Sequence, residues 1–218
     1  MCRFLLYKSK EPSVITDTLN AFARMAEKSR AYDGDSQCDG WGISWLENNT
    51  WHTYKSVRPI WEDVDSFTQF PSSTLYTIHA RSASFPQHKN NIEYNQPYID
   101  NAYSFVFNGL LKGVTLPIPG NIGAQKIWNL LNGQLKTKKV DVGFHTAVEI
   151  LKKNARVVQA LNMGLAYKGS IAAYSTYAEH PLYYSLHYVD EPSFKLICSE
   201  PIEGFSFKTL PNNSFLLL

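Results

Sequence analysis

The chain begins MCRFLLY, residues 1–7, and this stretch poses the first question about the fold. Residues 2–7 are apolar or aromatic apart from Arg3, which is typical of a short strand buried on both faces. The chain has only three cysteines, and one of them directly follows Met1. Cys2 is either a small apolar residue that begins a strand or, once Met1 is removed, a terminal residue with a special chemistry. Position alone favours the first interpretation.

An N-terminal cysteine combines a thiol and a free α-amino group in one residue. Cys2 is small enough for methionine aminopeptidase to remove Met1. An α-amino group has an unperturbed pKa of about 7.7–8.0, so near neutral pH an appreciable fraction is free base. That base can take the thiol proton directly or through a water molecule. Cys2 is therefore a candidate nucleophile that carries its own base.

The composition predicts a globular protein with no charged partner surface. Hydrophobic residues make up 44% of the 218 residues and charged residues 18%, which is enough apolar material for a core. Basic and acidic residues, 21 and 19 in number, are mixed along the chain. We therefore expect one domain over residues 1–218, binding neither nucleic acid nor an acidic membrane.

Cysteine spacing and hydropathy bear on location and cofactors. Cys2, Cys38 and Cys198 are odd in number and lack metal-ligand spacing, so we expect reduced thiols, no metal site and no cofactor. The sequence shows no signal peptide and no run of about 20 apolar residues. These features predict a cytoplasmic protein.

Apolar spacing predicts strands and helices in separate blocks along the chain. The expected helices cover residues 13–29, 123–135 and 144–161, and the expected early strands cover 2–7, 75–80 and 103–107, with a hairpin turn at Asn48-Asn49. The last third returns to strands, in LNMGLAYKG, SIAAYST, LYYSLHYV, FKLICSEP and SFLLL. Strand blocks separated by helices, without strict alternation, predict an α+β layered protein with a largely antiparallel sheet.

The segment IHARSAS, residues 78–84, ends a predicted strand with polar side chains. Arg81 offers a planar fork suited to a substrate carboxylate, and Ser82 and Ser84 add hydroxyl groups. Taken alone, Arg81 is more simply a member of a surface ion pair, and His79 a buried imidazole with its hydrogen bonds satisfied.

The segment FVFNGLL, residues 105–111, contains an Asn-Gly pair between apolar residues. Such a pair is most often a tight turn. Alternatively, the Asn108 side-chain amide and the Gly109 backbone N–H form an oxyanion hole for a tetrahedral intermediate. The segment Asp39-Gly40-Trp41-Gly42 is a weaker candidate, whose glycines allow positive φ or close backbone approach.

Taken together, these motifs resemble a known family. In order, MCRFLLY, DGWGISW, IHARSAS, YNQPY, FNGLL, YYSLHY and CSEPI resemble class II glutamine amidotransferase-like proteins of the N-terminal nucleophile hydrolase superfamily, in particular stand-alone chains that begin Met-Cys-Arg or Met-Cys-Glu. The resemblance implies a four-layer αββα sandwich of two stacked, mainly antiparallel sheets. It also implies that Cys2 attacks a side-chain amide and that Asn108 and Gly109 stabilise the oxyanion. His79, Arg81 and Ser84 would belong to the substrate-binding motif, with Arg81 on an α-carboxylate.

Two positions depart from the family pattern. Phe107 stands where a histidine usually precedes the Asn-Gly pair. Ile122-Gly123-Ala124-Gln125 stands where Thr-Asp-Ser-Glu usually opens a helix, and the aspartate of that motif would hold the substrate's α-ammonium. Free glutamine should bind poorly unless Asp33, Asp35 or Asp100 substitutes, because a buried ammonium without its counter-charge is costly. A substrate whose amine is acylated or absent fits the remaining groups better.

The leading hypothesis is a cysteine amidohydrolase that cleaves a side-chain amide or a γ-glutamyl-type amide through a Cys2 thioester. The released ammonia either passes to a separate synthase or is lost in simple hydrolysis, which we favour. A second hypothesis is a catalytically silent family member that acts as a binding module or regulatory subunit. A third, a plain structural protein, explains each segment but not their order. The expected partner is a small-molecule amide, and the aromatic content is compatible with an oligomer.

Overall fold

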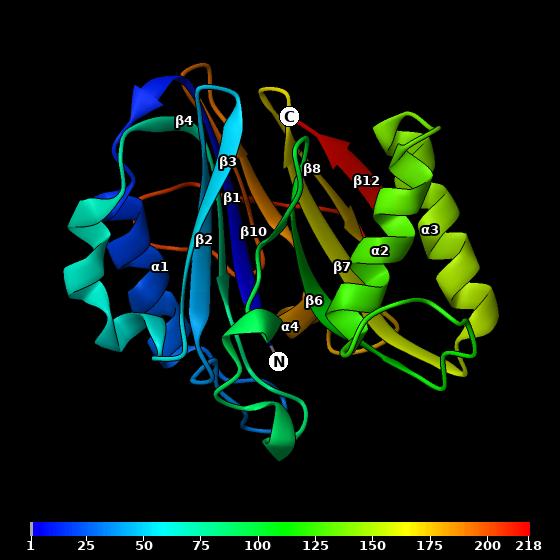
Figure 1. The fold of residues 1–218 in the computed structure, drawn as a ribbon. Helices are drawn as coiled ribbons and strands as arrows, with labels where there is room; N and C mark the ends of the chain where they lie inside the picture. The colour runs from blue at the N-terminus through cyan, green and yellow to red at the C-terminus, as the bar shows by residue number, and fades with distance from the viewer. Residues whose placement is uncertain (1) are drawn as a thin grey trace.

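In the computed structural model, which describes residues 2–218, two antiparallel β-sheets stack face to face (Figure 1). The first sheet has seven strands in the order β11-β9-β10-β1-β4-β2-β3, so that β1 lies near its centre. Its strands are β1 (Arg3–Ser13), β2 (Trp41–Glu47), β3 (Thr50–Ser56), β4 (Ser73–Ala80), β9 (His187–Asp190), β10 (Phe194–Cys198) and β11 (Lys208–Thr209).

The second sheet has five strands in the order β12-β8-β7-β6-β5. Its strands are β5 (Tyr98–Ile99), β6 (Ser104–Lys112), β7 (Val157–Tyr167), β8 (Ser170–Ser175) and β12 (Ser214–Leu217). Strands β4 and β1 of the first sheet contact β6 of the second, so the middle of each sheet faces the other.

Helices cover the outer face of each sheet, which gives four layers in the order αββα (Figure 1). The helix α1 (Thr16–Lys28) and the 3-10 turns η1 (Ile60–Glu62) and η2 (Val64–Gln69) cover the first sheet, and α2 (Gly123–Leu135) and α3 (Val140–Asn154) cover the second. The remaining short elements are η3 (Pro86–His88), η4 (Ile92–Tyr94) and α4 (Pro181–Tyr184). No helix within residues 2–218 is long and apolar enough to cross a membrane. The predicted four-layer sandwich is confirmed.

Of the four hydrophobic clusters within residues 2–218, the three largest fill the three spaces between the layers. In β1, Leu5 packs toward α1, whereas Phe4 and Leu6 face the second sheet. Leu131 of α2 and Phe144 of α3 pack against the outer face of the second sheet. Each fully buried Phe or Leu side chain contributes about 1.5–3 kcal/mol through burial of apolar surface. The alternation in β1 confirms a strand that is buried on both faces and fixed in register by packing.

Several element boundaries differ from the sequence prediction. The segment LYYSLHYV, expected as a strand, begins in the short helix α4 and becomes the strand β9 only at His187. The Asn108-Gly109 pair is not a turn, because β6 continues through it and Asn108 lies opposite Asn162 of β7. The helix expected over residues 144–161 ends at Asn154, and the chain pairs with β6 from Val157 onward. The hairpin at Asn48-Asn49 is confirmed, with φ of 50° and 61°, the positive values of a type I′ turn.

Candidate active site

Cys2 lies at the end of the central strand β1, beside Arg81. Arg3 pairs with Ala80 of β4, which places the preceding Cys2 alongside the following Arg81. The Cys2 Sγ donates to the carbonyl oxygen of Ser82 at 3.6 Å. Removal of the sulfur from water raises the pKa of the Cys2 thiol above its ordinary value, because burial disfavours the thiolate. The Cys2 thiol is therefore neutral near pH 7, and any reaction in which its sulfur acts as a nucleophile would need a base.

The Asn108 side chain is buried between the sheets without a hydrogen-bond partner. It is 1% exposed, and neither its Nδ2 nor its Oδ1 has a partner among residues 2–218. A buried amide left unpaired costs about 1–3 kcal/mol, so such a group marks a place where the fold gives up stability. Gly109 follows it, and a Cβ at that position would lie 2.2 Å from the carbonyl oxygen of Ala160. Only glycine fits this close to the Ala160 carbonyl.

Arg81 is a buried cation that holds only neutral acceptors. Its Nη2 donates to the carbonyl of His88 at 2.7 Å. Its Nη1 donates to Asn95 Oδ1 at 3.1 Å and to the Asp39 carbonyl at 3.4 Å. No carboxylate in the described part of the chain forms an ion pair with Arg81, although it is only 4% exposed. Its charge is thus available to an anionic ligand.

His79 is a buried neutral imidazole. It is fully buried, and burial together with the neighbouring Arg81 charge lowers the pKa of His79 to about 3. Neither ring nitrogen makes a close hydrogen bond of good geometry within residues 2–218, although the Phe107 backbone acts on the imidazole as a hydrogen-bond partner and opposes the fall in its pKa.

The Asn95-Gln96 loop connects the two sheets beside these groups. Asn95 donates from Nδ2 to the Ser56 carbonyl at 2.7 Å while its Oδ1 accepts from Arg81. Gln96 binds both backbone groups of Phe107: Oε1 accepts from its N–H at 2.6 Å, and Nε2 donates to its carbonyl at 3.3 Å. The Phe107 side chain packs instead with the cluster under α2 and α3. The loop thereby fixes the strand residue that precedes Asn108.

The two glycines of the DGWG motif make room for this loop. A Cβ on Gly40 would lie 2.4 Å from Asn95 Nδ2, and a Cβ on Gly42 would lie 2.4 Å from the Gln96 carbonyl oxygen. Gly40 also has φ of +111°, a backbone conformation that favours glycine. The motifs DGWG and YNQPY are therefore two sides of one contact.

The remaining polar candidates lie at different distances from Cys2. Asp35, which we could not place from the sequence, accepts a hydrogen bond from Ser82 Oγ, and its charge acts on Cys2. Ser84, by contrast, is exposed two residues beyond Ser82. Asp100 binds the backbone of its own turn and Asn132 Nδ2. The sequence offered Ser82 as one hydroxyl of the IHARSAS segment and Asp35 as one of three possible acids, and only the fold places both of them beside Cys2.

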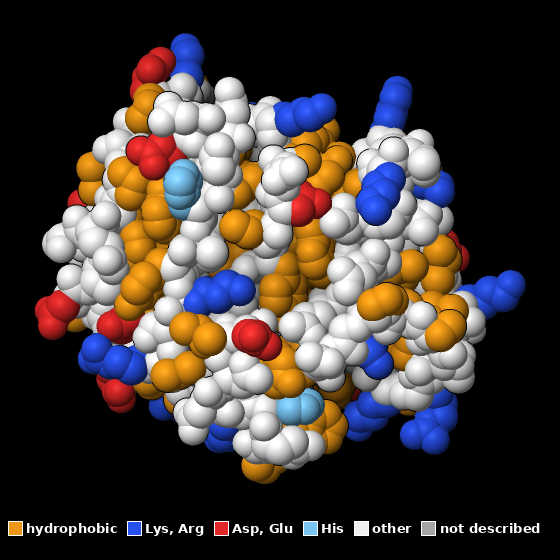
Figure 2. Space-filling view, in the orientation of Figure 1, with side chains coloured by type: hydrophobic (Ala, Val, Ile, Leu, Met, Phe, Trp, Pro, Cys, Tyr) orange, Lys and Arg blue, Asp and Glu red, His pale blue; other side chains and the backbone are white. Residues whose placement is uncertain are grey.

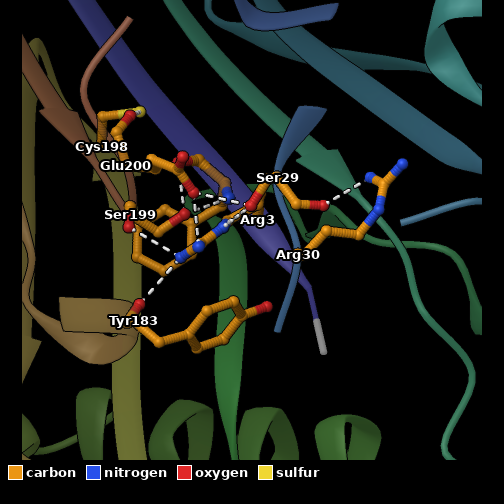
Figure 3. Close-up of polar contacts among 8 residues, drawn as sticks. Arg3, Ser29, Arg30, Tyr183, Cys198, Ser199 and Glu200 are labelled. Atoms are coloured by element: carbon orange, nitrogen blue, oxygen red, sulfur yellow. Dashed lines mark hydrogen bonds and ion pairs between the residues drawn. The ribbon is translucent and has the colours of Figure 1, made fainter. Parts of the chain in front are cut away.

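Arg3 anchors the end of β1 next to Cys2 (Figure 3). Its guanidinium forms an ion pair with Glu200 and donates to Ser29 Oγ at 2.9 Å. It also donates to the carbonyls of Tyr183 at 2.8 Å and Ser199 at 3.0 Å. Figure 3 shows these partners converging on Arg3 from separate segments of the chain. The network holds Arg3 in place and so fixes the position of the adjacent Cys2.

Two tyrosines connect Cys2 to surface pockets. Burial raises the pKa of the Tyr98 hydroxyl and that of Tyr183, and the charge of Cys2 adds to the rise at both. Tyr98 lines a cavity of about 450 Å³, and Tyr183 lines another of about 600 Å³.

Solved structures with the same fold identify the architecture. The chain superposes on the glutamine aminotransferase class-II domain protein of Silicibacter pomeroyi with a TM-score of 0.66 at 14% identity, covering 99% of this chain and 94% of that one. It also superposes on the glutamine phosphoribosylpyrophosphate amidotransferase of B. subtilis, complexed with ADP and GMP, with a TM-score of 0.63 at 11% identity over 91% of this chain. The match covers 42% of that longer protein.

A predicted glutamine amidotransferase from Pseudomonas aeruginosa matches with a TM-score of 0.51 at 14% identity, covering 100% of this chain and 93% of that one. No protein-family model and no curated protein matches the sequence. The four-layer sandwich, with a cysteine at the start of a central strand, is the N-terminal nucleophile hydrolase fold. Within that class, the chain has the fold of class II glutamine amidotransferase domains.

Proposed function

We propose that the protein is a cysteine amidohydrolase in which Cys2, freed of Met1, cleaves a side-chain amide or a γ-glutamyl-type amide. The observation that carries this proposal is the buried, unpartnered Asn108 amide on the strand that faces β1 and β4. A buried polar group that has no hydrogen-bond partner in the resting protein is suited to donate a hydrogen bond to the transition state. The raised pKa of the Cys2 thiol adds the requirement for a base, which its own amine meets.

The reaction follows from these groups. The Cys2 amine takes the thiol proton, and the sulfur attacks the amide carbon to form a C–S bond. Asn108 Nδ2 and the Gly109 N–H donate to the resulting oxyanion. The intermediate collapses when the C–N bond breaks and the leaving nitrogen takes the proton from the Cys2 ammonium. Water then attacks the thioester with the same amine as base, which releases the acid and restores Cys2.

Neighbouring groups have supporting roles in this proposal. Asp35, bound to Ser82 and acting electrostatically on Cys2, would orient the free Cys2 amine. Arg81, buried without a carboxylate partner in residues 2–218, would bind an anionic group of the substrate. Gly123 opens α2 and has no side chain, so this position supplies no carboxylate for an ammonium. We therefore propose a substrate whose α-amine is acylated or absent, with ammonia or an amine released by simple hydrolysis.

The test is release of ammonia or amine from a panel of glutamine and N-acylglutamine amides. Wild-type protein should hydrolyse at least one N-acylated member, and Cys2→Ala should abolish turnover while the thermal unfolding midpoint stays the same. Unchanged turnover in Cys2→Ala would exclude the mechanism. The competing proposal, a silent binding module, is favoured by Phe107 and Gly123, and it predicts binding of an amide without turnover.

A further inference from the structure

A cavity of about 450 Å³ opens at the edge of the sandwich, where β3, β5 and the start of α2 meet. Figure 2 shows this face hollowed between the half that carries β3 and the half that carries α2, with hydrophobic side chains on the floor of the hollow. The residues that line the cavity are Lys55, Tyr98, Ile99, Gly120, Gln125, Trp128 and Asn129. The lining combines two aromatic rings, two amides and a single charged group.

Lys55 is the charged group, and its ammonium has no anionic partner. Its Nζ lies 5.3 Å from the centre of the Tyr98 ring. Within residues 2–218 it forms neither a hydrogen bond nor an ion pair, and no acidic residue lines the cavity. The Lys55 side chain is half-buried, and this burial lowers its pKa to about 8. A partly desolvated cation in a cavity without acids favours an anionic ligand.

The cavity is coupled to the proposed active site. Lys55 pairs with Gly42, and Gly42 pairs with His79, so Lys55 lies on a continuous row of strand residues that leads to β1. Its charge acts on His79 and contributes to the low pKa of that imidazole. Tyr98, which lines the same cavity, is within reach of the charges of Arg81 and Cys2. A geometric link also exists, because Asn95 binds Arg81, Gln96 binds Phe107, and Tyr98 follows Gln96 by two residues. A single ligand would have to extend past Tyr98 to contact both Lys55 and Cys2.

We propose that this cavity binds a second anionic group of the substrate, a carboxylate seated on Lys55, so that the substrate is an acidic N-acylated glutamine-type amide. The inference rests on the proposed function for the cleaved bond, and it adds the charge and position of the acyl cap. Lys55 provides the charge, Trp128 and Tyr98 provide apolar walls for the linking carbons, and the Gln125 and Asn129 side chains border the cavity.

The test uses two probes that differ by one charge. Both are diazomethyl ketones of L-glutamate, in which CHN₂ replaces the amide NH₂; one carries an N-succinyl cap and the other an N-succinamoyl cap. The Cys2 sulfur forms a C–S bond as N₂ leaves, and the thiol proton passes to the same carbon. The second-order rate of labelling at Cys2 is followed by mass spectrometry for wild type, Lys55→Met, Lys55→Arg and Lys55→Glu. Lys126→Met is the control, since it removes a lysine of α2 that does not line the cavity.

Wild type, Lys55→Arg and Lys126→Met should label about tenfold faster with the succinyl probe, as expected for one partly desolvated, charge-assisted hydrogen bond. Lys55→Met should lose this preference and Lys55→Glu should reverse it. Equal rates for the two probes in wild type, or a preference that survives in Lys55→Met, would overturn the inference.

Failure of the proposed function would look different, because neither probe would then label Cys2. In that case the cavity is tested by calorimetry with N-succinyl-L-glutamine and N-succinamoyl-L-glutamine. Tighter binding of the succinyl compound, lost in Lys55→Met, would support the cavity assignment alone. Equal or undetectable binding of the two compounds would refute it.

Discussion

At the scale of single residues, Asn108 and Asn162 form a natural comparison. They lie directly opposite each other on β6 and β7, and both are buried. Asn162 donates to the Tyr184 carbonyl at 2.6 Å and accepts from Ser175 and Thr176, whereas Asn108 has no partner in the described chain. The same side chain is thus used once for stability and once, in our proposal, for catalysis.

This contrast predicts opposite effects of one substitution. Asn108→Leu should leave the free energy of unfolding unchanged or raise it by about 1 kcal/mol, because a buried unsatisfied amide is removed. Asn162→Leu should lower it by roughly 2–4 kcal/mol, because the Tyr184 carbonyl and its other partners lose their bonds. Urea denaturation of the two variants measures both values. If Asn108→Leu lowered the free energy of unfolding as much as Asn162→Leu does, Asn108 would contribute to stability and the contrast would be refuted.

His79 gives a prediction for stability against pH. The unfolded imidazole titrates at about 6.5, and the folded pKa is lowered to about 3. Between these values the unfolded chain binds more protons, so the free energy of unfolding falls as the pH drops through this window and is fully kept above it. From pH 7 to pH 4 the loss due to His79 should be about 3 kcal/mol.

The measurement compares the pH dependence of urea unfolding in wild type and in His79→Leu. The wild type should lose more stability on acidification, and the difference between the two proteins isolates His79 from the carboxylates. Parallel curves would mean that the imidazole is protonated or hydrated in the folded state.

At the scale of elements, the start of β1 depends on Arg3. Arg3 is buried and binds four partners, including Glu200, which is 35% exposed. Arg3→Met should lower the free energy of unfolding by about 3 kcal/mol, as expected when one side of a buried network is removed. It should also slow labelling of Cys2, since the strand end loses its anchor.

The exposed ion pair between Arg24 and Glu203 provides the control. Arg24 binds Glu203 at 3.2 Å, with the two side chains 52% and 69% exposed. Arg24→Met should change stability by no more than about 0.5 kcal/mol and leave labelling unchanged. If Arg3→Met and Arg24→Met lost similar amounts of unfolding free energy, the Arg3 network would not stabilise the start of β1.

Sequence patterns predicted elements well where a local apolar run or turn determines the structure, and poorly where strand pairing determines it. The apolar run in residues 2–7 indicated a strand buried on both faces, and the twin asparagines at 48–49 indicated the hairpin. The Asn108-Gly109 pair read as a turn, but pairing with β7 keeps it in a strand. The Gln96 contact with Phe107 joins segments that no local pattern connects. Local propensity cannot report a contact made by the folded chain.

At the scale of the whole molecule, the order of the motifs predicted the layers and the structure confirms them. Each motif falls at a place where the two sheets or their connecting loops meet: Cys2 at the end of β1, the DGWG glycines under the Asn95-Gln96 loop, and Asn108 in β6. The solved structures share this fold at 11–14% identity, which establishes the architecture. In our proposal the chemistry depends on a few side chains; the fold assigns a place to Asp35, which the sequence offered only as a possible acid, and it adds Lys55.

The central claim is that Cys2 becomes a terminal nucleophile, and the intact mass of natively expressed protein tests it most directly. The intact mass is measured by mass spectrometry before and after treatment with the N-acetylated diazomethyl ketone of L-glutamate. Peptide mapping then distinguishes a label on Cys2 from a label on the other two cysteines. Cys198 is buried with its pKa raised to about 12, so it should not react. We predict a mass without Met1 and one label on Cys2. A mass that retains Met1, with no label on Cys2, would contradict the account.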